Sequence, residues 1–307
     1  MTRVFIDGSA GTTGLRIADR LADRRDIAVM TLPDALRKDP NARRDAICGA
    51  DIAFLCLPDD AAREAVALVG ESDVKIIDTS TAHRTADAWA YGFPELTGCK
   101  ERIQTSKRIS NPGCHASGFV ALVRPLVENG ILPENAQLTC FSLTGYSGGG
   151  KKMIAEYEDT HRSPLLKAPR QYALTQQHKH LKEMAKLSKL ENLPIFCPIV
   201  GDFYSGMEVT VPLFADQLRA SFEEIRQLYA DYYATGLVRC SHSADPDGLL
   251  SAVAYSGRDD MQVGVYGNEE RIVLTARFDN LGKGASGAAI QNMNILMGLP
   301  EETGLNV

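Results

Sequence analysis

Short apolar runs alternate with amphipathic segments along the first third of the chain. Four of these runs predict buried strands, at 3–7, 27–32, 50–57 and 74–81. After the first run, apolar residues recur at helical spacing at Leu15, Ile17, Ala18 and Leu21, and another amphipathic pattern ends near residue 69. Strands that alternate with helices are typical of βαβ units, so residues up to about 110 predict a parallel sheet covered by helices.

The pattern changes after residue 114. A helix predicted at 117–129 is followed by longer runs rich in Thr, Val and Phe, which predict strands at 136–146, 194–214, 252–257, 261–267 and 271–280. Runs of strands with few helices between them indicate a mixed or antiparallel sheet, and hence a second, α+β domain. The last segment, 283–299, predicts a helix whose many small residues pack closely against another surface.

Composition places the chain among soluble two-domain proteins. It has 307 residues, of which 44% are hydrophobic and 23% charged. No apolar run approaches the roughly 18 to 20 residues that cross a bilayer, and the N-terminus enters a strand pattern at once. We therefore expect a cytoplasmic protein with no membrane partner. The net charge of -6, without a basic stripe, gives no support to nucleic-acid binding.

The seven cysteines form no recognisable framework. Their number is odd, and no CxxC pair or close cluster occurs. This argues against both a disulfide framework and a structural zinc site. We expect no metal.

A glycine-rich turn follows the first strand and opens the first helix. Such a turn lets the backbone approach a pyrophosphate, whose charge lies at the helix N-terminus. Its candidate cofactor-binding residues are Gly8, Ser9, Ala10, Gly11, Thr12, Thr13 and Gly14. The alternative is a turn whose glycines serve packing alone.

The segment after the second strand bears on the choice of dinucleotide. An NAD site often has an acidic residue at the end of this strand. Asp34 is near that position, but a basic cluster of Arg37, Lys38, Arg43 and Arg44 follows it. Basic side chains suit a 2′-phosphate, so we expect NADP. A solvated basic helix face would give the same pattern.

Cys114 stands at a loop-to-helix transition. It follows Asn111, Pro112 and Gly113, and the residues after it are small apart from His115. An ordinary cysteine thiol has a pKa near 8.5, so only a few per cent of it is thiolate at pH 7. A helix N-terminus lowers this pKa and so increases the thiolate fraction. The position favours a nucleophile, although most free cysteines are simply buried.

Two of the six histidines, His178 and His180, lie close together in the sequence. A thiolate enzyme needs an acid or base of near-neutral pKa, and Glu183 would share a helix face with His180 and orient its ring. A metal site built on this pair lacks a third strong ligand nearby. A solvated polar helix start is the remaining alternative.

Two further glycine-containing segments complete the candidate cofactor site. Backbone amides of Ser147, Gly148 and Gly149 could line a nicotinamide or anion site, although a surface loop is an equal alternative. Asn280 and Lys283 join the last strand to the last helix, where they could place that helix start near the same site.

Together these residues resemble the N-acetyl-γ-glutamyl-phosphate reductase family of arginine biosynthesis, in its shorter type 2 form. The similar stretches follow in order along the chain: GSAGTTGLRI, LCLPDDAA, DTSTAHR, YGFPEL, SNPGC, GYSGGGKK and NLGKGASGAAIQNMN. Aspartate-semialdehyde dehydrogenase has a similar NLGKGA ending, so that stretch alone marks only the wider superfamily.

The resemblance implies an α/β fold with an NADP-binding Rossmann domain at 1–114, completed by a C-terminal helix within 284–307. A catalytic and dimerisation α+β domain with a mixed sheet would span 115–283, and a dimer or tetramer would fit the family. The implied reaction is NADPH-dependent reduction of a small acyl phosphate, N-acetyl-γ-glutamyl phosphate, through a cysteine thioester.

The same resemblance implies roles for individual residues. Cys114 matches the catalytic cysteine, and the histidine pair 178/180 matches the region of the acid/base. We expect Arg84, Asn111 and Glu183 to bind the substrate. The family more often has an aromatic residue where this chain has His115, which is either a cation that holds the thiolate or a ring-for-ring replacement.

Two rival functions follow from the same sequence. Aspartate-semialdehyde dehydrogenase would use the same chemistry on a smaller substrate. A non-catalytic dinucleotide-binding sensor would bind NADPH without phosphate-dependent turnover.

Overall fold

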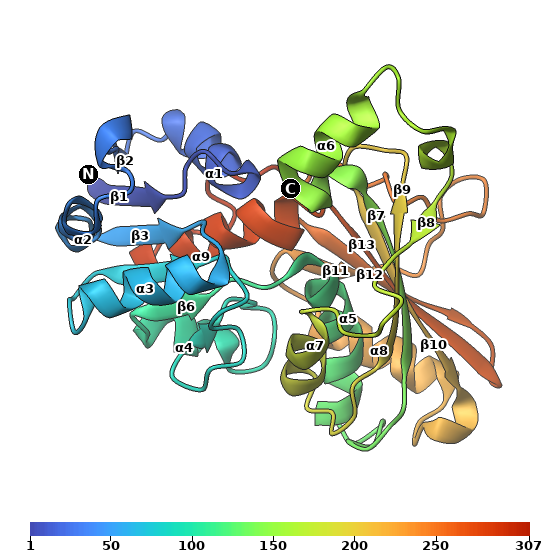
Figure 1. The fold of residues 1–307 in the computed structure, drawn as a ribbon. Coiled ribbons are helices and arrows are strands. Elements are labelled where there is room, and N and C mark those ends of the chain that lie inside the picture. Colours follow the sequence, from blue (N-terminus) through green and yellow to red (C-terminus); the bar gives the residue numbers. More distant parts are fainter. The chain divides into compact units, whose positions relative to one another are not determined.

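The alternating N-terminal pattern folds into a six-stranded parallel sheet with helices on both faces (Figure 1). The computed structural model describes all 307 residues, and its first compact unit comprises residues 1–112 and 285–305. The strand order is β2-β1-β3-β4-β6-β5. The elements of this unit are β1 (Thr2–Asp7), α1 (Thr12–Ala22), β2 (Ile27–Met30), η1 (Asp34–Leu36), α2 (Pro40–Gly49), β3 (Ile52–Leu55), α3 (Asp59–Val69), β4 (Lys75–Asp78), β5 (Ala90–Tyr91), α4 (Cys99–Thr105), β6 (Arg108–Ser110) and α9 (Gly287–Met297).

Alternate residues of the central strands enter two different cores. Val4 and Ile6 pack with residues of α1 and α9, whereas Phe5 packs with residues of α2 and α3 on the other face. Burial on both faces explains why these strands read as continuous apolar runs. The predicted C-terminal helix is thus confirmed as α9, which returns to this sheet and contacts α1, α4 and β4.

The second compact unit, residues 113–284 with 306–307, contains a seven-stranded mixed sheet in the order β11-β12-β13-β10-β7-β9-β8. The β7–β9 and β11–β12 pairs are parallel and the others antiparallel. Its elements are α5 (Cys114–Glu128), β7 (Thr139–Gly145), η2 (Tyr146–Gly149), α6 (Gly150–Glu158), η3 (Pro164–Lys167), β8 (Arg170–Gln171), α7 (Leu181–Leu187), β9 (Ile195–Gly201), β10 (Met207–Phe214), η4 (Ala215–Gln217), α8 (Phe222–Tyr232), β11 (Val238–Cys240), β12 (Met261–Gly267), β13 (Arg271–Phe278) and a π-helical turn (Gly282–Ser286).

Helix α5 packs on one face of the mixed sheet, with α7 and α8 beside it. A Cβ on Gly118 would lie 2.5 Å from the Val209 side chain, so this glycine lets α5 approach β10 closely. The opposite face carries exposed apolar side chains, among them Phe141 and Ile195.

The predicted α/β class is confirmed, but three local predictions needed correction. Helix α5 begins at Cys114 rather than at 117, and the run 194–214 is two strands, β9 and β10. The segment predicted as a strand at 252–257 consists of turns, because its amides bond to carbonyls three residues back, as Ala254 does to Ser251 at 3.2 Å.

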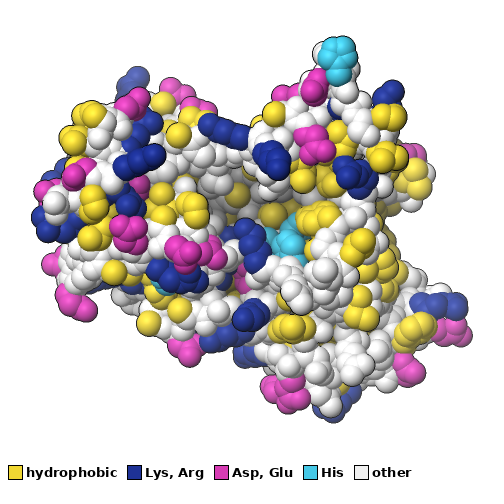
Figure 2. Space-filling model, in the orientation of Figure 1, with side chains coloured by type: hydrophobic (Ala, Val, Ile, Leu, Met, Phe, Trp, Pro, Cys, Tyr) yellow, Lys and Arg dark blue, Asp and Glu magenta, His cyan; other side chains and the backbone are white.

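The surface carries mixed charge and no candidate membrane span. On the face drawn in Figure 2, Lys and Arg side chains lie scattered among Asp and Glu side chains. None of the helices combines the length and the apolar composition that crossing a bilayer requires.

Candidate active site

The glycine-rich turn between β1 and α1 needs two of its three glycines for packing. Gly8 has a φ of +86°, and a Cβ there would lie 2.3 Å from the Cys56 carbonyl oxygen. A Cβ on Gly14 would lie 2.5 Å from the Gly8 carbonyl oxygen. A Cβ on Gly11 would meet no protein atom closer than 3.4 Å. Packing therefore accounts for Gly8 and Gly14, whereas Gly11 leaves space beside the start of α1.

The N-terminus of α1 has the properties of an anion site. Gly11 is the N-cap and provides no side-chain hydrogen bond, and the first turn contains no acidic residue. The first amides of a helix have no partner within it, and their partial positive charge favours a phosphate. This turn fits the pyrophosphate of a dinucleotide.

A cavity of about 350 Å³ adjoins this turn at the end of β2. It is lined by Gly8, Ser9 and Ala10 and, after β2, by Thr31, Leu32, Arg37, Lys38 and Arg43. Two acidic residues, Asp7 and Glu64, also line it, and Asp34 follows shortly after β2.

The four basic residues predicted to bind a 2′-phosphate differ in their surroundings. Arg43 is buried, and its Nε and Nη2 donate to Asp7 Oδ2 at 3.0 and 2.9 Å. Arg44 pairs with Asp45 at the surface and does not line the cavity. Lys38 and Arg37, which pairs with Asp34 at 2.8 Å at the surface, are the remaining cations that line the cavity and could meet a phosphate.

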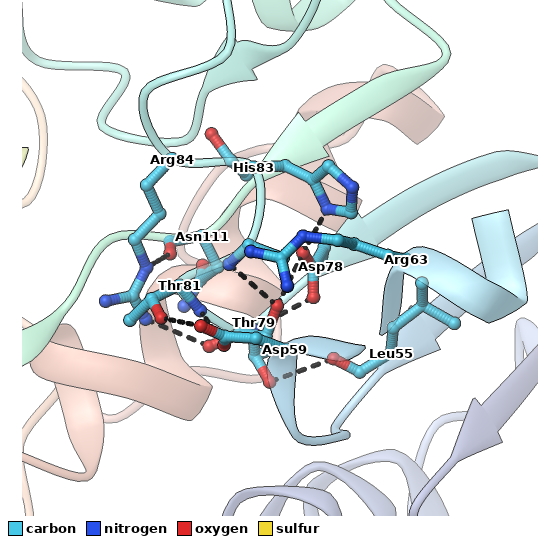
Figure 3. Close-up of polar contacts among 12 residues, drawn as sticks. Leu55, Asp59, Arg63, Asp78, Thr79, Thr81, His83, Arg84 and Asn111 are labelled. Carbon is cyan, nitrogen blue, oxygen red and sulfur yellow. Dashed lines mark hydrogen bonds and ion pairs between the residues drawn. The ribbon is translucent and has the colours of Figure 1, made fainter. Parts of the chain in front are cut away.

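Arg84 lies in the loop after β4, within a dense polar network (Figure 3). The side chain is only 8% exposed, its Nε donates to the Asn111 carbonyl at 2.9 Å, and its Nη2 donates to the Thr79 carbonyl at 2.9 Å. The Asn111 side chain donates to the Ala285 carbonyl at 2.9 Å. The structure thus brings Arg84 and Asn111 together in the first unit.

The loop that carries Arg84 is fixed by two carboxylates. Buried Asp78 accepts from Ser80 N and Oγ and pairs with His83 Nδ1 at 2.6 Å, while the His83 ring stacks on Trp89. Asp59, at the start of α3, accepts from Thr81 N at 2.9 Å and from its hydroxyl (Figure 3). Because both ends of the loop are held, Arg84 has a defined position.

Cys114 is the first residue of α5, a helix of 15 residues with Gly113 as its N-cap. The thiol side chain is partly exposed, unlike the largely buried helix that follows it. A Cβ on residue 284 would lie 3.0 Å from Cys114 Cβ, so Gly284 leaves the cysteine its space. The helix N-terminus is the position that favours a thiolate.

Glu183 connects this helix start with the histidine pair. His180 is the N-cap of α7, and Glu183 lies in the first turn of that helix. The Glu183 Oε1 accepts from the Gly113 amide at 2.8 Å, directly before the cysteine. The structure therefore joins His180, Glu183 and Cys114 in one part of the second unit.

Three histidine rings pack together beside the start of α5. The ring centroids of His115 and His178 are 5.7 Å apart, those of His115 and His180 are 5.6 Å apart, and those of His178 and His180 are 4.8 Å apart. Burial lowers the pKa of His115 to about 3 and that of His178 to about 4. Both rings are therefore neutral near pH 7, so His115 is not the cation that the sequence left open.

The two members of the predicted pair differ. His178 Nδ1 accepts from the His180 amide at 3.2 Å, which commits that nitrogen as an acceptor. His180 is 5% exposed, and as the N-cap of α7 it stands three residues before Glu183 in the first turn of that helix.

The remaining predicted cofactor residues also lie in the second unit. Ser147 and Gly148 belong to η2, and the Asn280 side chain donates to Ser147 Oγ at 3.0 Å. Lys283 lies in the π-helical turn and is 1% exposed. This segment is thus an ordered turn, joined to the last motif by a hydrogen bond.

Sequence reasoning missed two side chains of this site, Tyr172 and Ser142. Both bond to His115, the first at 2.8 Å from Nε2 and the second at 2.7 Å from Nδ1. Tyr172 lies in the loop that leads to the histidine pair, a proximity that could have drawn attention to it. Ser142 comes from β7 and has no signal in the sequence.

This combination of folds matches known semialdehyde dehydrogenases. Residues 34–106 match the family model of the semialdehyde dehydrogenase NAD binding domain, and residues 114–280 that of the semialdehyde dehydrogenase dimerisation domain. The fold is similar to aspartate semialdehyde dehydrogenase II from Vibrio cholerae, with a TM-score of 0.73, 16% identity, and coverage of 97% and 98% of the two chains. The enzyme from Candida albicans gives a TM-score of 0.63 at 16% identity over 97% and 98% of the chains. The fold and its domains define a dehydrogenase of the semialdehyde class, with an NAD(P)-binding domain.

Curated relatives narrow this class. N-acetyl-γ-glutamyl-phosphate reductase 2 from Nostoc sp. is 48% identical over 99% of this chain and 99% of its own, and the reductase from Sinorhizobium medicae is 45% identical over 96% and 98%. The chain therefore belongs to the N-acetyl-γ-glutamyl-phosphate reductase family.

Proposed function

We propose that the chain reduces N-acetyl-γ-glutamyl phosphate to N-acetylglutamate semialdehyde and phosphate, with NADPH, in arginine biosynthesis. Cys114 carries the proposal: it opens a 15-residue helix beside a histidine cluster, in a chain 48% identical to a reductase of that name. The unit that holds the glycine-rich turn would bind the cofactor, and the unit that holds Cys114 would perform the chemistry.

The first step is attack of the Cys114 thiolate on the acyl phosphate carbon. A carbon–sulfur bond forms, and the carbonyl oxygen becomes an oxyanion. As the oxyanion collapses, the bond from carbon to the phosphate oxygen breaks and phosphate leaves with its electron pair. The product on Cys114 is a thioester, which accepts hydride far better than a carboxylate does.

When bound, NADPH supplies the hydride that reduces the thioester carbon. The pyrophosphate would be held by the amides at the start of α1, and the adenosine 2′-phosphate by Arg37 and Lys38 at the cavity after β2. Ser147, Asn280 and Lys283 would hold the nicotinamide end. The two cations at the cavity, Arg37 and Lys38, support NADP over NAD.

His180 would move the proton. It donates a proton to the oxygen after hydride addition, and takes it back as the carbon–sulfur bond of the thiohemiacetal breaks to release aldehyde and thiolate. His178 is less suited to this role, because a pKa of about 4 leaves its ring without the extra proton near pH 7, and its Nδ1 already accepts from a backbone amide. Glu183, in the first turn of α7, would orient His180 as well as the loop before Cys114.

Arg84 and Asn111 are proposed substrate ligands. The two carbonyl contacts of Arg84 fix the plane of its guanidinium, a geometry that suits an anion bound by two parallel N–H groups. Asn111 would act mainly by holding Arg84 through its carbonyl oxygen.

The chain would work as a homodimer or a dimer of dimers in the cytoplasm. The uncovered face of the mixed sheet is apolar over β7 and β9, where Phe141 is 43% and Ile195 59% exposed. Figure 2 shows hydrophobic side chains along the edge of this unit near β8 and β9. A second copy of the same face would cover these side chains, in keeping with the dimerisation domain family that residues 114–280 match.

Side-by-side turnover tests the substrate. The purified chain is given NADP, phosphate and either N-acetylglutamate semialdehyde or aspartate semialdehyde, and NADPH formation is followed. We expect kcat/KM to favour the acetylated aldehyde by at least about 10²-fold, because the site must accommodate its amide and longer chain. A preference for aspartate semialdehyde would assign the chain the rival activity, and binding of NADPH without turnover of either aldehyde would indicate a sensor.

A further inference from the structure

His115 lies directly after the proposed nucleophile, yet no step of the reaction uses it. Its ring is 4% exposed, and both nitrogens have partners: Nδ1 lies 2.7 Å from Ser142 Oγ, and Nε2 lies 2.8 Å from the Tyr172 hydroxyl. Because the ring is neutral, one nitrogen donates and the other accepts. The two hydrogen bonds that link Ser142, His115 and Tyr172 can therefore run in either of two directions.

Ser142 decides between them. It lies on β7 with 0% exposure, and its hydroxyl has no partner other than His115. If His115 donated from Nδ1, the serine hydrogen would be buried without an acceptor, at a cost of about 1–3 kcal/mol. If Ser142 donates to Nδ1, both the serine hydroxyl hydrogen and the Nδ1 lone pair have a hydrogen-bond partner. The proton of His115 then resides on Nε2.

The Nε2–H group donates to the Tyr172 oxygen, so the hydroxyl hydrogen of Tyr172 points elsewhere. The tyrosine backbone is held firmly: its amide donates to the Pro198 carbonyl at 3.0 Å, and Gln176 of the same loop bonds to both the amide and the carbonyl of Phe196 at 2.8 and 2.7 Å. Ala173 and Gln176 adopt positive φ values of 52° and 56° within this loop, conformations that persist because these bonds hold them.

We propose that Ser142 and His115 are positioning residues that make the Tyr172 hydroxyl a hydrogen-bond donor to the group bound on Cys114. This inference rests on the proposed function. Burial and the nearby Cys114 charge raise the pKa of Tyr172, which keeps its proton in place. The carbon attached to the Cys114 sulfur carries an oxyanion after thiolate attack and again after hydride addition, and a fixed neutral donor stabilises both.

The groups that surround His115 are consistent with a neutral imidazole ring. The rings of Tyr172, His178 and His180 surround it, together with Phe196, and no carboxylate is among its ring contacts or hydrogen-bond partners. Burial, His178 and Lys179 all disfavour an imidazolium at His115, so His115 acts by the direction of its hydrogen bonds and not by charge.

Tyr172→Phe, His115→Phe and His115→Gln test the proposal through turnover with N-acetylglutamate semialdehyde, NADP and phosphate. Both phenylalanine variants should lower kcat by about 10–100-fold with little change in KM, because they remove an oriented donor. His115→Gln should recover part of that loss, since its amide N–H can replace Nε2–H. The double variant His115→Phe/Tyr172→Phe should be no worse than either single variant. Losses that multiply in the double variant would overturn the proposal.

A second readout does not depend on activity. Long-range ¹H–¹⁵N NMR of the wild-type chain labelled in histidine distinguishes the two tautomers and the imidazolium, and His115→Gln assigns the signal. We expect the Nε2–H tautomer of His115 at pH 7, and a shift in the tautomer ratio in Ser142→Ala. An Nδ1–H tautomer or an imidazolium at pH 7 would contradict the inference, even if turnover with either aldehyde were absent and the proposed function had failed.

Discussion

His115 and His178 are histidines that the folded chain keeps neutral. Their pKa values of about 3 and about 4 lie below the value near 6.5 of an exposed histidine. Between pH 6.5 and the folded-state pKa, the unfolded chain binds protons that the folded chain does not. The stability that these rings contribute is therefore fully present above pH 6.5 and is lost as the pH falls toward 3.

His115→Phe should make the chain less sensitive to acid. Between pH 6 and 4, the unfolding free energy of the wild type should fall more steeply than that of the variant, by up to about 1.4 kcal/mol per pH unit, because one proton is no longer taken up on unfolding. Urea titrations at several pH values measure this slope. His161→Phe, at an exposed histidine, is the control and should keep the wild-type slope. Equal slopes for wild type and His115→Phe would mean that His115 is not buried in its neutral form.

Lys38 and Arg37 are expected to set the preference for NADP. Replacement of either by Ala should weaken NADP binding by about 10-fold and leave NAD binding nearly unchanged, since only the 2′-phosphate is lost as a partner. Arg44→Ala is the matched control, because Arg44 lies on the same segment but does not line the cavity. Calorimetric titration with both nucleotides measures the two affinities. Equal weakening of NADP and NAD binding would mean that the two cations contact a part of the cofactor other than the 2′-phosphate.

At the scale of the elements, the glycines of the turn between β1 and α1 are expected to have different roles, Gly14 in packing and Gly11 in cofactor binding. Gly14→Ala should lower the unfolding free energy by about 1–3 kcal/mol, because its Cβ would overlap the Gly8 carbonyl. Gly11→Ala should unfold close to the wild type, because its Cβ would meet no protein atom closer than 3.4 Å. It should bind NADP at least about 10-fold more weakly, because its methyl group would stand where we propose that the phosphates approach α1. A Gly11→Ala chain that binds NADP normally would show that the pyrophosphate lies elsewhere.

Elements with a clear hydrophobic period were predictable from the sequence, and those held by side-chain contacts were not. Strands β1 to β4 and helix α1 stand out because burial on one or two faces leaves a regular pattern, whereas the short strands β5 and β6 were not predicted. The segment 252–257 has apolar residues but folds as turns, and Gly257, with a φ of +81°, ends them by donating to Asp279 Oδ2 at 2.5 Å. Such a tertiary bond leaves no trace in local periodicity.

The candidate site shows the same division. Cys114, the histidine pair and the first glycine-rich turn were found because each marks the start of a helix or follows a strand. Ser142 and Tyr172 come from distant segments and reach His115 only through the fold. The sequence therefore marked the groups that we propose to react, and Glu183 as a residue that orients one of them, but it did not mark Ser142 or Tyr172.

For the whole molecule, the uncovered sheet face predicts association. Phe141→Asp and Ile195→Asp place charges on this face, and each should shift the chain toward a monomer in sedimentation velocity at micromolar concentration. Leu15→Asp is the control, since Leu15 is also exposed but belongs to α1 of the other compact unit and not to the mixed sheet. If both sheet variants sediment as the wild type does, this face does not carry the proposed association.

The central claim is that Cys114 forms a covalent bond with the substrate, and the reaction run from the aldehyde tests it most directly. NADPH formation from N-acetylglutamate semialdehyde, NADP and phosphate is measured for the wild type, Cys114→Ala, Cys114→Ser and the control Cys48→Ala, which removes an exposed thiol of α2. We predict that both Cys114 variants lose at least about 10³-fold in turnover while Cys48→Ala retains wild-type turnover. Substantial phosphate-dependent turnover by Cys114→Ala would contradict the account.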